Sequence, residues 1–391
     1  MRKLIVIFIL IFMLAPTAVL AEQTATSNES GEHNITPELN LEEINNYIGQ
    51  IDSEIKKVTP DIDFKQLVYK IARNEIELNP GEMAKKIMSY VFMEVVANSS
   101  LLGKLVILAI ICAVLQNLTS SFDRGTTGQL TYMVTYLVMI TLAIGSFTIA
   151  INAGREVVDR MVTFMQAILP VLLTLLVAVG GFTSAAIYQP VVFVSIALIA
   201  TIIRNIILPL ILFSAILFLV SNLSSKFKVS NLAGLIKNVA MGLLGLMSTI
   251  FLGVLSIQGV AGAVGDSVVL RTAKFATDTF VPVVGGMFSD ALEAIVSSSL
   301  LIKNAVGIAG VVVVLYIMLM PLVKILCIAL IYKLAGAMIQ PVEDGGQVVG
   351  CLNDLGNSLL SVFAVVATAG LLFFFTLTIL VAVGNITVML R

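Results

Sequence analysis

The strongest constraint in this sequence is a series of long apolar segments with few charged residues. The segments lie at about 101–119, 130–151, 166–182, 187–203, 206–222, 238–260, 305–333 and 358–384. A membrane-spanning helix needs about 20 predominantly apolar residues. The chain has 391 residues, of which 58% are hydrophobic and 12% charged, and soluble domains contain roughly 45–50% apolar residues. We therefore expect an all-α, polytopic membrane protein with seven to nine membrane segments.

The first 21 residues are typical of a secretory signal peptide. Arg2 and Lys3 precede a short apolar run, and small residues around Ala21 come before a polar segment. We expect cleavage after Ala21, and an uncleaved anchor helix is the alternative. In both cases the residues that follow lie outside the cytoplasm.

Residues 22–98 form an acidic segment with 14 acidic and 7 basic side chains. Residues 22–40 have little to bury and predict a flexible start. Apolar residues at helical spacing then predict three helices, at 41–58, 63–78 and 82–97. We expect a small extracytoplasmic helical domain, whose apolar stripes pack together, against the membrane body or on a partner. Its acidic charge argues against nucleic-acid binding.

Residues 99–391 form the predicted multispan membrane domain. Pro321 either kinks the run 305–333 or separates two spans. The Lys226 to Lys237 segment is expected inside the cell, and the loop with Glu343 outside it if Pro321 separates two spans. Weak matches at an offset of about 111 residues suggest internal repeats at about 155–265 and 266–391. Chance similarity between apolar helices is the alternative.

Enzyme chemistry has little support in the sequence. It contains no phosphate-binding loop, no dinucleotide fingerprint and no paired-cysteine motif. The single histidine, His33, lies in a polar stretch, and it offers neither a metal site nor a base near the membrane. We expect no enzymatic activity, cofactor or metal, and any ATP-derived energy has to come from another subunit.

The segment from Pro282 to Gly307 is the most distinctive stretch of the chain. Pro282 can open a helix, and Gly285-Gly286 permits a bend or a close helix contact. The polar residues that follow share approximately one helical face. This face is our candidate path or partner surface, and an ordinary amphipathic surface helix is the alternative. The candidate residues are Pro282, Gly285, Gly286, Asp290, Glu293, Lys303 and Asn304.

Three isolated charges fall in or beside apolar segments, namely Lys104, Arg204 and Lys324. A charge within lipid is costly and is therefore a functional candidate. Lys104 can extend to the interface, and Arg204 with Asn205 fits a loop between spans. Lys324 is the candidate intramembrane charge, although a break at Pro321 would place it near water.

The Pro282 to Gly307 segment, the signal peptide, the acidic helical domain and the multispan body together resemble the stage III sporulation protein AE family of endospore-forming Firmicutes. The resemblance covers essentially the whole chain. It implies a mother-cell membrane protein of the apparatus that joins mother cell and forespore across the intermembrane space. It also implies a cytoplasmic ATPase and other membrane and ring-forming proteins as partners.

The resulting hypothesis is a non-enzymatic, permease-like subunit of a sporulation channel or secretion complex. One alternative is a self-sufficient secondary transporter of a small solute, which the candidate repeat favours. The spans offer few acidic residues to bind a coupling cation. A membrane scaffold without a pore is a further alternative, and the sequence does not separate it from a channel.

Overall fold

A computed structural model describes residues 64–73, 80–121, 126–223, 229–280, 285–341 and 347–389 of the chain, and these residues form helices and no strand. Two short N-terminal helices are α3 (Phe64–Ala72) and α4 (Pro80–Ala97). The remaining elements are α5 (Ser99–Ser121), α6 (Thr126–Ala178), α7 (Phe182–Ile202), the π-helix η1 (Ile203–Ile207), α8 (Leu208–Leu223), α9 (Ser230–Phe280), α10 (Gly285–Ile339) and α11 (Gln347–Met389).

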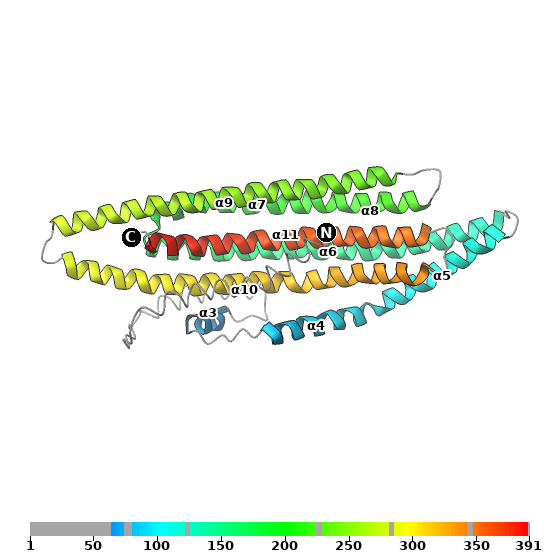
Figure 1. The fold of residues 1–391 in the computed structure, drawn as a ribbon, viewed down its shortest axis with the longest axis horizontal. Helices are drawn as coiled ribbons and strands as arrows, with labels where there is room; N and C mark the ends of the chain where they lie inside the picture. Colours follow the sequence, from blue (N-terminus) through cyan, green and yellow to red (C-terminus); the bar gives the residue numbers. More distant parts are fainter. Residues whose placement is uncertain are drawn as a thin grey trace.

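The long helices lie side by side along one axis and form an elongated bundle (Figure 1). Successive long helices run in opposite directions, and α7, η1 and α8 act together as one helix. The last helix, α11, contacts α6, α8, α9 and α10 and is the most enclosed. A helix satisfies every backbone N–H and C=O within itself, which is what an apolar segment in lipid requires. The predicted all-helical membrane architecture is confirmed in this coarse form.

Five helices among the described residues are long and apolar enough to cross a membrane. A sixth candidate is the pair Val91–Ala97 and Ser99–Leu115, bent by 51°. This number does not confirm the seven to nine membrane segments that the sequence predicts. The difference arises because two pairs of predicted segments each form one continuous helix. Segments 130–151 and 166–182 both lie in α6, and segments 187–203 and 206–222 both lie in Phe182–Asn222.

Proline does not break these long helices. Pro321 lies inside the continuous helix α10, so of the two alternatives for this residue, a kink or a separation of two spans, the separation is wrong. Arg204 and Asn205 lie in η1, within continuous helix rather than in the loop that the sequence suggested. Neighbouring helices and local π-helical turns re-satisfy backbone groups that proline frees in membrane helices. A real turn occurs between α6 and α7, where Gly180 has φ of 98°.

The continuity of α10 changes the relation between two loops. At one end of the bundle, α8 and α10 terminate and α9 and α11 begin (Figure 1). The connections after α8 and after α10 therefore start from the same end, whereas the sequence placed the Glu343 loop on the opposite side only if Pro321 separates two spans. The candidate repeat is not confirmed, and its boundaries fall inside the continuous helices α6 and α9.

The N-terminal part contacts the bundle through α3. Phe64 and Val68 of α3 are buried in the main hydrophobic core, and α3 packs on α10. The sequence left three packing partners open for the apolar stripes of the acidic segment. Phe64 and Val68 pack against the membrane body. The predicted helix 82–97 corresponds to α4, and 63–78 corresponds in its first part to α3. The signal peptide and the predicted helix 41–58 lie outside the described residues.

Candidate functional site: polar groups within the apolar bundle

The structure describes only part of the predicted Pro282 to Gly307 site. Pro282 lies outside the described residues, and α10 begins at Gly285 and Gly286. Asp290 and Glu293 lie in this helix, but their side chains are not described. Their role in a path or partner surface stays a prediction.

Lys303 is the largest fully buried charged side chain among the described residues. Its Nζ donates a hydrogen bond to the backbone oxygen of Val381 on α11, at 2.7 Å. The ammonium lies against Gly384, where an added Cβ would overlap it. An ammonium has three donors, and a buried charge is costly unless it is well paired. Lys303 is therefore a stronger candidate than the sequence alone indicated.

Two buried amide oxygens lie next to the Lys303 contact in the sequence. The Oδ1 atoms of Asn304 and Asn385 are buried, and neither accepts a hydrogen bond within the described part of the chain. Asn304 follows Lys303 on α10, and Asn385 follows Gly384 on α11. Buried polar atoms in native proteins nearly all have partners, so these two amides are candidates for binding a further polar group.

Lys324 is half-buried in the last third of α10, three residues after Pro321. The helix is continuous at this point, so the explanation that a break at Pro321 places Lys324 near water is wrong. Lys324 stays the candidate intramembrane charge. The structure does not bring it together with Lys303, which lies 21 residues earlier on the same helix.

A polar cluster joins four helices near the other end of the bundle. The Nζ atoms of Lys237 on α9 and Lys333 on α10 donate to the backbone and side-chain oxygens of Asn357 on α11, at 3.0 and 2.7 Å. Asn222 of α8 donates to Asp354 of α11 at 3.0 Å. Asp354 also interacts electrostatically with both lysines. With two cations and one anion, the cluster holds an excess of positive charge inside the bundle.

Asp266 makes a second long-range polar contact, between α9 and the start of α7. Its side chain is 1% exposed. Its carboxylate accepts hydrogen bonds from the backbone N–H groups of Thr183, at 2.6 Å, and Ser184, at 3.2 Å. Gly181 at the N-cap of α7 makes no side-chain capping bond. Asp266 therefore supplies the missing N-terminal cap from another helix.

The outward face of α6 changes character along its length. Its exposed large hydrophobic residues are Met133, Val134, Leu137, Val138 and Ile149. Between 150 and 178 every exposed residue is polar, charged or small. We call this face the α6 polar stripe: Asn152, Glu156, Asp159, Arg160, Thr163, Gln166, Pro170 and Thr174. At 1.5 Å per residue it is about 33 Å long, similar to the roughly 30 Å of a hydrocarbon core.

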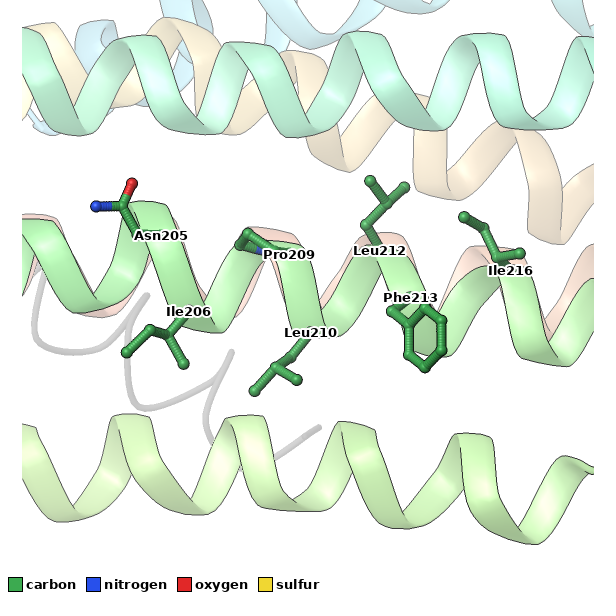
Figure 2. Close-up of a pocket in the computed structure, with 7 residues that line it drawn as sticks. All are labelled: Asn205, Ile206, Pro209, Leu210, Leu212, Phe213 and Ile216. Atoms are coloured by element: carbon green, nitrogen blue, oxygen red, sulfur yellow. The ribbon is translucent and has the colours of Figure 1, made fainter.

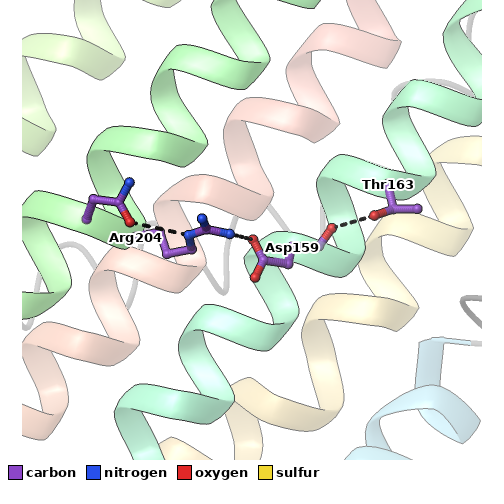
Figure 3. A network of polar contacts seen from close by, with 4 residues as sticks. Asp159, Thr163 and Arg204 are labelled. Atoms are coloured by element: carbon purple, nitrogen blue, oxygen red, sulfur yellow. Dashed lines mark hydrogen bonds and ion pairs between the residues drawn. The ribbon is translucent and has the colours of Figure 1, made fainter.

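Ion pairs lie on the α6 polar stripe and connect it to η1. Arg204 of η1 contacts Asp159 at 3.1 Å, and Arg160 contacts Glu156 at 2.6 Å. Thr163 donates to the backbone oxygen of Asp159 at 3.0 Å (Figure 3). These four charged side chains remain between 49% and 64% exposed. Such exposure of charge to lipid would be unfavourable.

An apolar recess of about 480 Å³ lies along η1 and α8 (Figure 2). Its lining is Asn205, Ile206, Pro209, Leu210, Leu212, Phe213 and Ile216. Asn205 is the only polar residue in this lining, so the recess has little with which to orient a polar ligand. Among the described residues there is also no group of three or more His, Cys, Asp or Glu side chains that could hold a metal ion.

Sequence reasoning missed Asp266, Lys333 and Asp354 as candidate residues, and it used Lys237 only as evidence for orientation. A signal was present, because each of these charges is isolated within or beside an apolar run. Their partners could not be read from the sequence, since the hydrogen bonds join different helices. The separation is 83 residues between Asp266 and Thr183 and 132 between Asn222 and Asp354.

Comparisons with known proteins agree with the resemblance seen in the sequence. Residues 62–384 match the family described as stage III sporulation protein AE. The chain is 38% identical over 395 residues to the stage III sporulation protein AE of Bacillus subtilis (strain 168). This match covers 99% of the chain and 98% of that relative. No solved structure matches the chain.

Proposed function

Because this chain belongs to the stage III sporulation protein AE family, we propose that it is a non-enzymatic membrane subunit of the channel or secretion complex that joins mother cell and forespore. The family membership establishes a role in sporulation. The channel complex, its location and the absence of enzymatic activity are parts of the proposal. The family resemblance and the arrangement of polar groups in the bundle support these parts of the proposal.

The α6 polar stripe is the observation that carries the proposal. Its charged residues are exposed half-way along a bundle whose helix α9 exposes mainly large apolar side chains. A protein surrounded by lipid on all sides would place Glu156, Asp159 and Arg204 in hydrocarbon, at an unfavourable free energy. A subunit of a larger assembly can instead cover these groups or place them beside water.

The proposal includes an orientation in the membrane. In this orientation the segment before α4 is outside the cytoplasm, as the predicted signal peptide implies, and in the intermembrane space, as the family resemblance implies. If α4 and α5 cross together, the six candidate spans return the chain to that side, so the C-terminus is extracytoplasmic as well. The proposed partners are a cytoplasmic ATPase and other membrane proteins of the same complex, as the family resemblance implies.

Purification from sporulating cells tests the proposal directly. An affinity-tagged chain that replaces the native protein and restores heat-resistant spores is extracted in mild detergent. We expect an ATPase and further membrane proteins to copurify, and mock-tagged cells provide the control. A stable lone protein that catalyses solute uptake in liposomes would contradict the proposal and support the secondary transporter.

Neutralising variants test the Pro282 to Gly307 segment within this function. Asp290→Asn with Glu293→Gln removes two charges and preserves size, whereas Gly285→Val with Gly286→Val alters backbone packing. If the charges face a path or a partner, the neutral variant inserts at normal levels and fails to support forespore development. Normal sporulation of both variants at normal protein levels would contradict a functional role of this segment.

A further inference from the structure

The bundle exposes opposite kinds of surface on two helices at the same level. Gly154 of α6 lies against Val362 and Val366 of α11. Gly259 of α9 lies against Ile379 and Val383 of the same helix. Because α6, α9 and α11 all run in one direction, the stretch of α9 before Gly259 is level with the stretch of α6 that follows Gly154.

Over this shared level α9 presents an apolar face. Leu246, Ile250, Val254 and Ile257 are exposed, at the spacing of three and four residues that marks one face of a helix. An apolar face of this length is suited to lipid. The α6 polar stripe, at the same level, exposes Asp159 and its neighbours instead. The two sides of the bundle are therefore adapted to different surroundings.

The length of the helices does not remove this contrast. The candidate spans contain 40 to 46 residues, which corresponds to about 60–69 Å at 1.5 Å per residue, and a hydrocarbon core is only about 30 Å thick. Part of the bundle therefore lies outside hydrocarbon. If this level of the bundle were entirely in water, the apolar face of α9 would be exposed to water. If it were entirely surrounded by lipid, the ion pairs on α6 would be exposed to lipid. Only different surroundings on the two sides satisfy both faces.

From this contrast we propose that the α6 polar stripe lines a water-filled path at membrane level, while α9 at the same level faces lipid. The stripe has side chains of both signs: Glu156 and Asp159 are acidic, and Arg160 and Arg204 are basic. Such a mixed wall suits polar solutes and water rather than one ion type. The inference rests on the proposed function, because the opposite wall of the path has to come from other subunits.

Single cysteines on the two helices test the inference, since a thiol reacts as its thiolate, which forms in water and not in lipid. The starting protein has alanine in place of Cys112, Cys327 and Cys351, all of which are buried. The stripe variants are Thr163→Cys and Gln166→Cys. The matched α9 variants, exposed at the same level, are Ile250→Cys and Ile257→Cys.

Each variant is expressed in sporulating cells, and native membranes, opened on both sides, are treated with a small charged thiol reagent. We expect the stripe cysteines to react at least about tenfold faster than the α9 cysteines. Equal and slow reaction of both pairs would overturn the inference. Equal and fast reaction would also overturn it, because this level would then lie outside the membrane. Reaction of the stripe only after detergent extraction would show that a partner protein covers it.

Heat-resistant spore counts and copurified partners are measured for the same strains. If partners copurify but the stripe cysteines do not react with the reagent, the proposed function is supported and the water-filled path is rejected. A reactive stripe on a protein that purifies alone contradicts membership of a complex, and with it a path whose opposite wall comes from other subunits. The proposed function can stand when the water-filled path fails, so the two failures are distinguishable.

Discussion

The carboxylate of Asp266 on α9 accepts a hydrogen bond of 2.6 Å from the backbone N–H of Thr183, and so caps α7 from a different helix. The bond joins residues 83 positions apart in the sequence. It lies beside the Gly180 turn, where the chain reverses between α6 and α7. The contact ties the start of one long helix to the side of another at the end of the bundle.

Removing this carboxylate should destabilise the protein. Asp266→Ala leaves the N–H groups of Thr183 and Ser184 without their acceptor, and we expect a loss of roughly 1–3 kcal/mol in the free energy of unfolding. Asp266→Asn retains one acceptor and should lose less. Thermal unfolding of the purified protein in detergent measures the difference. Asp159→Ala, at an exposed ion pair, is the control and should change stability by under about 1 kcal/mol. Equal effects of the two alanine variants would contradict a capping role.

Glycines set the close approach of α7 and α9. A Cβ added at Gly262 would lie 2.6 Å from the Oγ and 3.0 Å from the Cα of Ser184, so backbone has to move. Gly253 lies on the same helix with open space around it. We expect Gly262→Ala to destabilise the protein by roughly 1–3 kcal/mol through overpacking, and Gly253→Ala to be neutral or slightly stabilising. Thermal unfolding of both variants provides the comparison, and equal effects would contradict the close packing.

A pair of substitutions tests the close contact between Gly259 of α9 and Tyr188 of α7. The Cβ of Gly259→Ala would lie 2.6 Å from the hydroxyl of Tyr188, which donates to the backbone oxygen of Leu255. Tyr188→Phe removes that hydroxyl, so it should recover part of the stability that Gly259→Ala loses. The absence of any recovery in the double variant would show that the two side chains do not meet in this way.

The sequence was sufficient for the class of fold but not for the connections between helices. Apolar segments predict membrane helices because lipid excludes unsatisfied backbone groups. Pro321 and Arg204 gave misleading signals, since a proline or a charge is accommodated inside a helix when neighbouring helices support it. Lys303 was found because it belongs to a distinctive segment. The burial of its side chain under Gly384 depends on α11, some 80 residues later, and no local pattern reveals it.

The four-helix polar cluster should depend on its single anion. Asp354→Asn leaves Lys237 and Lys333 as two nearby cations without a compensating charge. We expect a loss of roughly 1–3 kcal/mol in stability in detergent. Asp354→Asn combined with Lys237→Met removes one charge of each sign and should recover part of this loss. A double variant as unstable as the sum of its parts would contradict electrostatic coupling within the cluster.

Lys303 allows a test that separates packing from function. Lys303→Met preserves the length of the side chain and removes its charge, and replacing a buried charge by a packed hydrophobic residue is often neutral or stabilising. We therefore expect normal protein levels and normal or raised thermal stability. If the ammonium has a role in the complex, the number of heat-resistant spores falls although the protein is present at normal levels. Normal spore counts at normal protein levels would assign Lys303 a packing role alone.

The last prediction concerns which ends of the helices share a side of the membrane. Ser230 begins α9 and Pro341 follows α10, and both lie at one end of the bundle. Phe182 begins α7 and Met389 ends α11, and both lie at the other. In a protein without its native cysteines, a cysteine at Phe182 or Met389 should react with a membrane-impermeant thiol reagent in intact cells. A cysteine at Ser230 or Pro341 should react only after the cells are opened.

A cysteine at Gln50 relates these sides to the acidic N-terminal segment. The signal peptide predicts that Gln50 is extracytoplasmic, so Gln50→Cys should react in intact cells together with Met389→Cys. Labelling of Met389 with protection of Gln50 would mean that α4 and α5 do not cross as one span. Labelling of Ser230 but not of Pro341 in intact cells would contradict a continuous α10 that crosses once, and would return Pro321 to the role of a break between two spans.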